Sequence, residues 1–124
     1  MDPQTTSLDL SKLLDVCTSG GVVDQALLVQ LLAMFLTDNS ARLQELPRTA
    51  QAGDVTAMRR VAHAVAGSAA TAGAVKLARL ARGVEQLAAE GTLPPTPMID
   101  AVTQEFAEVR AMLRSMYPDA DTHA

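Results

Sequence analysis

The residue of this chain best suited to chemistry is His63, which begins the run HAVAGS at residues 63–68. A neutral imidazole is a good nucleophile near neutral pH, because an unperturbed histidine titrates at about 6.5. It could therefore accept a phosphoryl group covalently. Gly67 follows one helical turn later, and a glycine inside a helix costs about 1 kcal/mol relative to alanine. That cost indicates a steric reason, and we expect Gly67 to let a partner's loop approach the ring.

His63 lies in a positively charged window, residues 55–84, that contains no Asp or Glu. Its five cations are Arg59, Arg60, Lys76, Arg79 and Arg82. The whole chain has 10 Lys+Arg and 14 Asp+Glu, so the rest of it carries five cations against 14 anions, a formal charge of −9. Such segregation predicts a docking face for an acidic protein. Nearby Arg or Lys could also stabilise a phosphoryl group by charge-assisted hydrogen bonds.

Length and composition narrow the class of protein. A chain of 124 residues fits one domain with a real core. The single cysteine, Cys17, excludes an intrachain disulfide and a CxxC pair, and no membrane span or secretory signal is visible. A net charge of −4 and 2% aromatic residues argue against nucleic-acid binding. We therefore expect a cytoplasmic monomer that needs no metal or cofactor.

Apolar spacing predicts an all-α protein, an antiparallel up-down four-helix bundle with a short extra N-terminal helix. The short helix follows Ser7 and ends at residues 19–21, and a long helix runs from Val23 to Leu46, with Pro47 bending or ending it. The remaining helices are expected over residues 55–71, 75–91 and 98–116, the first of them capped by Asp54 and ended by Gly73. Residues 93–97 form a stiff connector.

The corresponding domain division has three parts. Residues 1–7 are expected to be a flexible N-terminus, residues 8–116 the helical bundle, and residues 117–124 a disordered tail that includes His123. On the helix over residues 55–71, a stripe of small and apolar side chains is assigned to the core, with His63 just off it. The stripe consists of Met58, Ala62, Val65, Ala69 and Ala72.

The run HAVAGSAATAGA at residues 63–74, followed by Leu77 and Leu80, resembles the signature of the histidine-containing phosphotransfer (Hpt) domain family. Residues 35–36 and 53–54 are also similar to that family, so the resemblance extends from about residue 8 to 115. It implies a phosphocarrier that takes a phosphoryl group from a receiver-domain aspartate and passes it to another receiver, with His63 as the phosphorylated residue. The implied partners are response-regulator receivers or a hybrid sensor histidine kinase.

One position departs from the family pattern. The family usually has Lys three residues after the histidine, where its charge helps to balance the phosphoryl group, and this chain has Ala66. We expect Arg59 or Arg60, on the same exposed side as Ala66 and Gly67, to take over that role. Lys76 and Arg79 on the next helix are further candidates. Supporting roles are expected for Ser68 and Arg82.

Other functions remain open at this stage. An adaptor that binds a receiver or sensor kinase without transferring phosphate would use the same basic face, and Ala66 favours it. A hydrolase with His63 as general base needs an orienting carboxylate, which the acid-free window does not supply. An assembly bundle would use a Leu-rich face. No P-loop or Gly-rich kinase motif is present, so we expect no ATP-dependent kinase activity.

Overall fold

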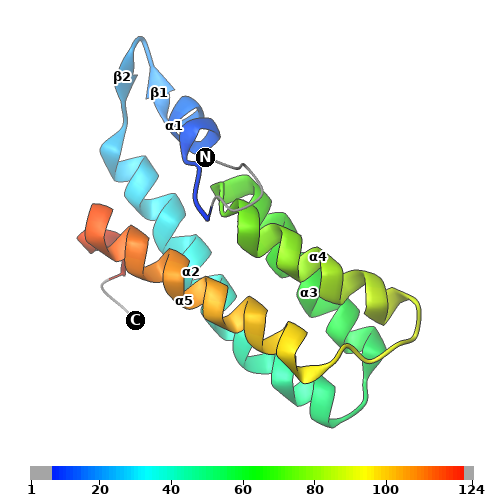
Figure 1. Ribbon diagram of the computed structural model, residues 1–124. Coiled ribbons are helices and arrows are strands. Elements are labelled where there is room, and N and C mark those ends of the chain that lie inside the picture. Colours follow the sequence, from blue (N-terminus) through cyan, green and yellow to red (C-terminus); the bar gives the residue numbers. More distant parts are fainter. Residues whose placement is uncertain (1–6, 122–124) are drawn as a thin grey trace.

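The computed structural model describes residues 7–121 of the chain. It is an all-α structure, as predicted, in which four long helices form an antiparallel bundle and a short helix lies at one end (Figure 1). In chain order the elements are α1 (Ser11–Val16), β1 (Thr18–Ser19), β2 (Val22–Val23), α2 (Gln25–Gln51), α3 (Val55–Ala72), α4 (Val75–Ala89), α5 (Thr96–Met116) and the 3₁₀ helix η2 (Pro118–Asp121). Within residues 7–121 no helix is both long and apolar enough to cross a bilayer.

Both ends of α3, the helix that carries His63, are set by local chemistry. The Asp54 side chain accepts a hydrogen bond from the backbone N–H of Ala57 at 3.0 Å, which confirms the predicted N-cap. Gly73 ends the helix with a φ of 84°, a left-handed conformation that favours glycine. A Cβ at Gly73 would also collide with the backbone carbonyl of Asp9. This turn brings α4 back antiparallel to α3.

The core lies along the inner faces of the four long helices. All five members of the predicted α3 stripe are buried, which confirms that assignment. Leu28, Leu32 and Leu46 of α2 are also buried, as are Val102 and Val109 of α5. Because the stripe faces inward, the opposite side of α3 is left for solvent or for a partner.

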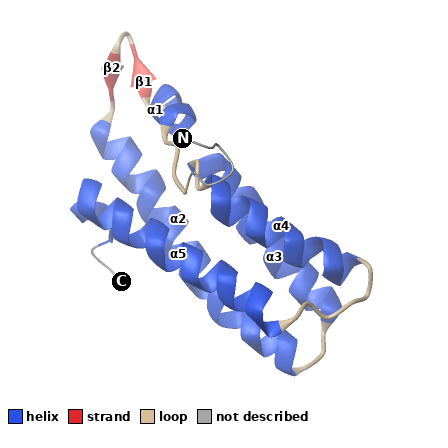
Figure 2. Cartoon of the chain, viewed as in Figure 1, coloured by secondary structure: helices blue, strands red, loops and turns tan. Residues whose placement is uncertain are grey.

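Three boundaries differ from the prediction. Helix α1 ends at Val16, before the expected end at residues 19–21, and residues 18–23 form an antiparallel hairpin whose two strands are red in Figure 2. Pro47 lies inside α2, which continues to Gln51. Leu46 is 1% exposed and Ala50 packs against the core, and this packing on either side of Pro47 offsets the hydrogen bond that proline cannot donate. Helix α5 begins at Thr96, inside the expected connector.

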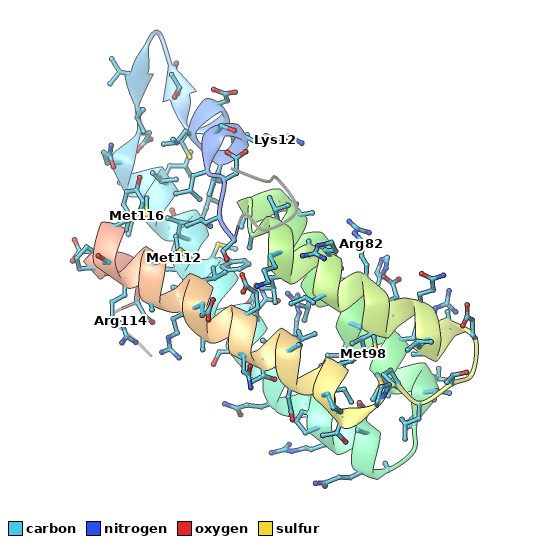
Figure 3. The ribbon with its side chains drawn as sticks, in the orientation of Figure 1. Lys12, Arg82, Met98, Met112, Arg114 and Met116 are labelled. Carbon is cyan, nitrogen blue, oxygen red and sulfur yellow. The ribbon has the colours of Figure 1, made fainter. Side chains whose placement is uncertain are left out.

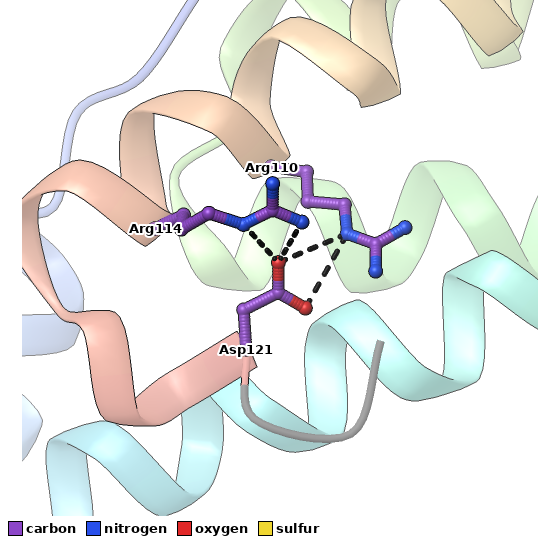
Figure 4. A network of polar contacts seen from close by, with 3 residues as sticks. All are labelled: Arg110, Arg114 and Asp121. Atoms are coloured by element: carbon purple, nitrogen blue, oxygen red, sulfur yellow. Dashed lines mark hydrogen bonds and ion pairs between the residues drawn. The ribbon is translucent and has the colours of Figure 1, made fainter.

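The predicted disordered tail is wrong for Pro118–Asp121, which form η2 between α2 and α5. Asp121 has a side chain only 3% exposed and binds two arginines of α5, Arg114 Nη2 at 2.7 Å and Arg110 Nε at 3.1 Å (Figure 4). Burial raises the pKa of Asp121, but the hydrogen bonds from Arg114 and Arg110 outweigh it and leave the pKa below the ordinary value. His123 and the expected flexible residues 1–6 lie outside the described residues.

Candidate functional site

His63 projects from the solvent side of α3 and meets one carboxylate of the neighbouring helix. Its Nδ1 lies 2.6 Å from Oε2 of Glu85 on α4, and the two side chains are 73% and 21% exposed. An ionised carboxylate only accepts hydrogen bonds, so in the neutral ring Nδ1 carries the proton. The lone pair is then on Nε2, which has no hydrogen-bond partner within residues 7–121. The contact therefore leaves an exposed, unprotonated nitrogen available to react.

Two of the predicted cations share a surface hollow with the histidine. The hollow is lined by Thr56, Arg59, Arg60, His63 and Glu85. Arg59 and Arg60 precede His63 by four and three residues, which places them beside it on the helix surface, and both are exposed. An anion bound at Nε2 would have both arginines within the same hollow.

The other three predicted cations lie elsewhere. Lys76 pairs with Glu105 of α5, with Nζ 3.8 Å from Oε1, and the Glu105 side chain is only 3% exposed. The other carboxylate oxygen of Glu105 has no hydrogen-bond partner among residues 7–121. Arg79 and Arg82 line a separate hollow with Lys12, and Figure 3 shows Arg82 pointing outward from α4. Lys76 thus partly balances a buried charge, and the five cations do not form one cluster around His63.

The expectation that Ala66 lies on the exposed side of α3 is wrong. Ala66 is 1% exposed, because α3 packs closely against α4 and this position faces inward. Gly67 does face solvent, and a Cβ added there would meet no atom within 4 Å. Ser68 is turned toward α2, where its Oγ accepts a hydrogen bond from Asn39 Nδ2 at 2.9 Å. None of these three residues brings a polar group to His63.

An apolar groove begins one turn from the histidine, beside Gly67. Its walls come from α1, α2 and α3, and its lining includes Leu13, Val16, Leu31, Met34, Gly67 and Thr71. Val16 is 70% exposed and Met34 is 53% exposed, high values for large apolar side chains. Lys12 and Asp38 add one charge of each sign to the lining. The histidine hollow and this groove together offer a polar and an apolar contact area on one side of α3.

Sequence reasoning missed two polar residues near the site. Glu85 is the first acid after the basic window, and the antiparallel turn at Gly73 brings it level with His63; counting residues outward from that turn would have located it. Asn39 interrupts the apolar spacing of α2 and is fully buried. Its Nδ2 also donates to the carbonyl of Phe35, and its Oδ1 accepts from Arg42 Nη1 at 3.3 Å.

The residues around His63 also bear on two other chemistries, hydrolysis with His63 as general base and metal binding. A carboxylate does lie beside His63, contrary to what the acid-free window suggested. No serine or threonine hydroxyl within residues 7–121 is hydrogen bonded to the ring, so the structure assembles no hydroxyl–imidazole–carboxylate relay. In the same part of the chain, no group of three or more His, Cys, Asp or Glu side chains is placed to hold a metal ion.

Comparison with known proteins agrees with this geometry. Residues 30–113, which include His63, match the model of the Hpt domain. The solved structure of histidine-containing phosphotransfer protein B (HptB) from Pseudomonas aeruginosa PAO1 is similar, with 32% identity, 90% of this chain and 95% of that chain covered, and a TM-score of 0.78. No curated protein matches the chain. The family match covers more than half of the chain and contains the exposed histidine, and the chain therefore belongs to the Hpt domain family of two-component signalling proteins.

Proposed function

We propose that this protein relays a phosphoryl group between receiver-domain aspartates through His63. The observation that carries the proposal is the His63–Glu85 contact, which leaves Nε2 exposed with its lone pair. The family supports the reaction class, because Hpt domains are phosphocarriers of two-component signalling. His63 is accordingly the covalent carrier, and Glu85 is a positioning residue that acts through the imidazole.

In the transfer step one bond to phosphorus forms and one breaks. The Nε2 lone pair attacks the phosphorus of an aspartyl phosphate, the P–O bond to the aspartate breaks, and the carboxylate leaves with the bonding pair. Nδ1 keeps its proton, so the phosphorylated ring carries positive charge. The carboxylate of Glu85, 2.6 Å away, is placed to stabilise that charge. The reverse step returns the group to a second receiver.

The surroundings of His63 suit a receiver whose phosphorylated edge is acidic. Arg59 and Arg60 supply positive charge in the histidine hollow, and the groove beside Gly67 supplies apolar surface. Within this proposal the receiver brings the metal and the groups that polarise its acyl phosphate, and the protein itself needs no cofactor and no kinase activity. Lys76 is reassigned from the phosphoryl site to its pair with Glu105.

A non-transferring adaptor is the second candidate, favoured by Ala66. That position is small and buried, so it adds no charge next to the phosphoryl group. An adaptor would bind through the same hollow and groove and would leave His63 unmodified. Binding alone therefore cannot separate the two functions, whereas movement of phosphate can.

A two-receiver relay tests the proposal. The protein is mixed with a phosphorylated receiver domain, and a second, unphosphorylated receiver is then added. The proposal expects label to appear first on the protein and later on the second receiver. Glu85→Gln, whose amide oxygen can still accept from Nδ1, should transfer faster than Glu85→Ala. Stable binding of both receivers with no movement of label would support the adaptor.

A further inference from the structure

Another cation, Arg42, lies on α2, the helix that packs beside α3. Arg42 is partly exposed, and its Nη1 donates a hydrogen bond of 3.3 Å to Oδ1 of Asn39. Asn39 is fully buried and donates from Nδ2 to Ser68 Oγ on α3 at 2.9 Å. The guanidinium is therefore tied to a buried bridge between α2 and α3, and part of its freedom is already lost in the unbound protein.

The bridge fixes which residues of the two helices face each other. Ser68 and Ala64 are four apart, so they share one side of α3, and Asn39 and Arg42 are three apart, so they share one side of α2. The helices run antiparallel (Figure 1), so moving three residues along α2 from Asn39 corresponds to moving about one turn back along α3 from Ser68. Arg42 therefore lies opposite Ala64, the residue next to His63.

Two residues of α3 that neighbour His63, Ala64 and Gly67, are small. Ala64 contributes only a methyl group, and Gly67 contributes no side chain at all. Packed helices lie about 8–10 Å apart, a span that a long arginine side chain can bridge across a single alanine. Arg60 approaches the ring from the other direction, along α3 itself.

Building on the proposed function, we infer that Arg42 binds the phosphoryl group on His63. Its planar guanidinium can donate two parallel hydrogen bonds to phosphoryl oxygens. In the unbound protein the guanidinium rests against Asn39 beside the Asn39–Ser68 bridge, and it would turn from there toward the phosphoryl group. Ser68 thus acts indirectly, through Asn39 and Arg42. Arg42 lies outside the basic window because it belongs to another helix, 21 residues earlier in the chain.

The test uses phosphoramidate, a small phosphoryl donor that needs no receiver. Nε2 attacks phosphorus, the P–N bond breaks and ammonia leaves, so the rate reports on the protein alone. Arg42→Gln should slow labelling of His63 by roughly two- to fivefold, the loss expected of one partly exposed charge contact. Arg42→Lys should react at a rate between those of Arg42→Gln and the native protein, since it keeps the charge and loses the paired hydrogen bonds. Arg48→Gln removes the same charge from the exposed end of α2 and should react like the native protein.

A second measurement distinguishes an electrostatic effect of Arg42 on the phosphoryl group from a structural effect of the substitution. In ³¹P NMR titrations, the phosphoryl group on His63 should release its last proton at a lower pH in the native protein than in Arg42→Gln, because a nearby cation favours the dianion. Native labelling in Arg42→Gln, or equal slowing in Arg42→Lys and Arg42→Gln, would overturn the role of Arg42 while leaving His63 as the carrier. Absence of label on the native protein would overturn both this inference and the proposed function.

Discussion

Replacing Gly67 by alanine should make the protein more stable and a poorer phosphate carrier. Gly67 has an ordinary helical conformation in the middle of α3, and an added Cβ would meet nothing within 4 Å. The substitution therefore removes the helix penalty of glycine without a clash, a gain of about 1 kcal/mol in the free energy of unfolding. For a chain of this size that gain raises the Tm by about 4 °C.

The same methyl group points at the surface where a receiver is proposed to dock. If the partner's backbone comes into contact with Gly67, the Cβ must push it away, and overpacking of this kind costs about 1 kcal/mol or more. We expect the second-order rate of transfer from a phosphorylated receiver to fall at least roughly fivefold. Thermal unfolding gives the change in Tm, and transfer assays on the same preparation give the change in the second-order rate.

Gly83 provides a matched control. It also lies inside a helix, α4, and an added Cβ would lie 3.5 Å from Met98 Cε, an ordinary van der Waals contact. Figure 3 shows Met98 near the start of α5, on a different part of the molecule from α1. Gly83→Ala should therefore be more stable and transfer normally. A lower Tm for Gly67→Ala would show that the added Cβ does not fit at this position. An unchanged transfer rate would show that the receiver does not contact Gly67 closely.

Three further predictions concern charges. Glu105→Leu should leave the free energy of unfolding unchanged or raise it by about 1–4 kcal/mol, because it removes a buried carboxylate whose Oε2 has no partner among the described residues. Lys76→Ala should lower the free energy of unfolding, because it leaves that carboxylate without its cation. Urea unfolding of the two variants measures both changes. Asp121→Asn should cost roughly 1 kcal/mol at neutral pH by weakening the clamp of η2. Because the folded-state pKa of Asp121 is depressed, its contribution is complete above the unfolded-state pKa of about 3.9 and is lost as the pH falls through the lower folded-state pKa, so the Tm difference from native should shrink in acid. Arg59→Glu or Arg60→Glu should weaken receiver docking and slow transfer about tenfold at low ionic strength and less at high salt, and an unchanged rate at low salt would remove these arginines from the site.

The helices and the core could be predicted from the sequence because they depend on local spacing. Apolar residues at three- and four-residue intervals define the buried stripe of α3, and Asp54 and Gly73 mark its ends through their own backbone chemistry. The hairpin was not predicted because each strand has only two residues. Nor was η2, whose position depends on an aspartate meeting two arginines of another element.

The site was only half predictable, since it is assembled from several helices. His63, its arginine neighbours and the open surface at Gly67 follow from one helix. The placement of Lys76 depends on a buried carboxylate of α5, and Ala66 is covered by the close packing of α3 on α4. Glu85 is 22 residues from His63 and meets it only through the antiparallel turn. A charge count along the chain cannot distinguish cations that face the histidine from those that face elsewhere.

The most direct test of the account is to locate the phosphoryl group after transfer. The native protein and His63→Ala are incubated with the same phosphorylated receiver domain. The stability of the label to acid and alkali is then measured, and peptide mapping locates the labelled residue. We predict an acid-labile, alkali-stable label on the peptide containing His63 in the native protein and none in the variant. Equal labelling of His63→Ala, or no label on the native protein despite measurable receiver binding, would contradict the account.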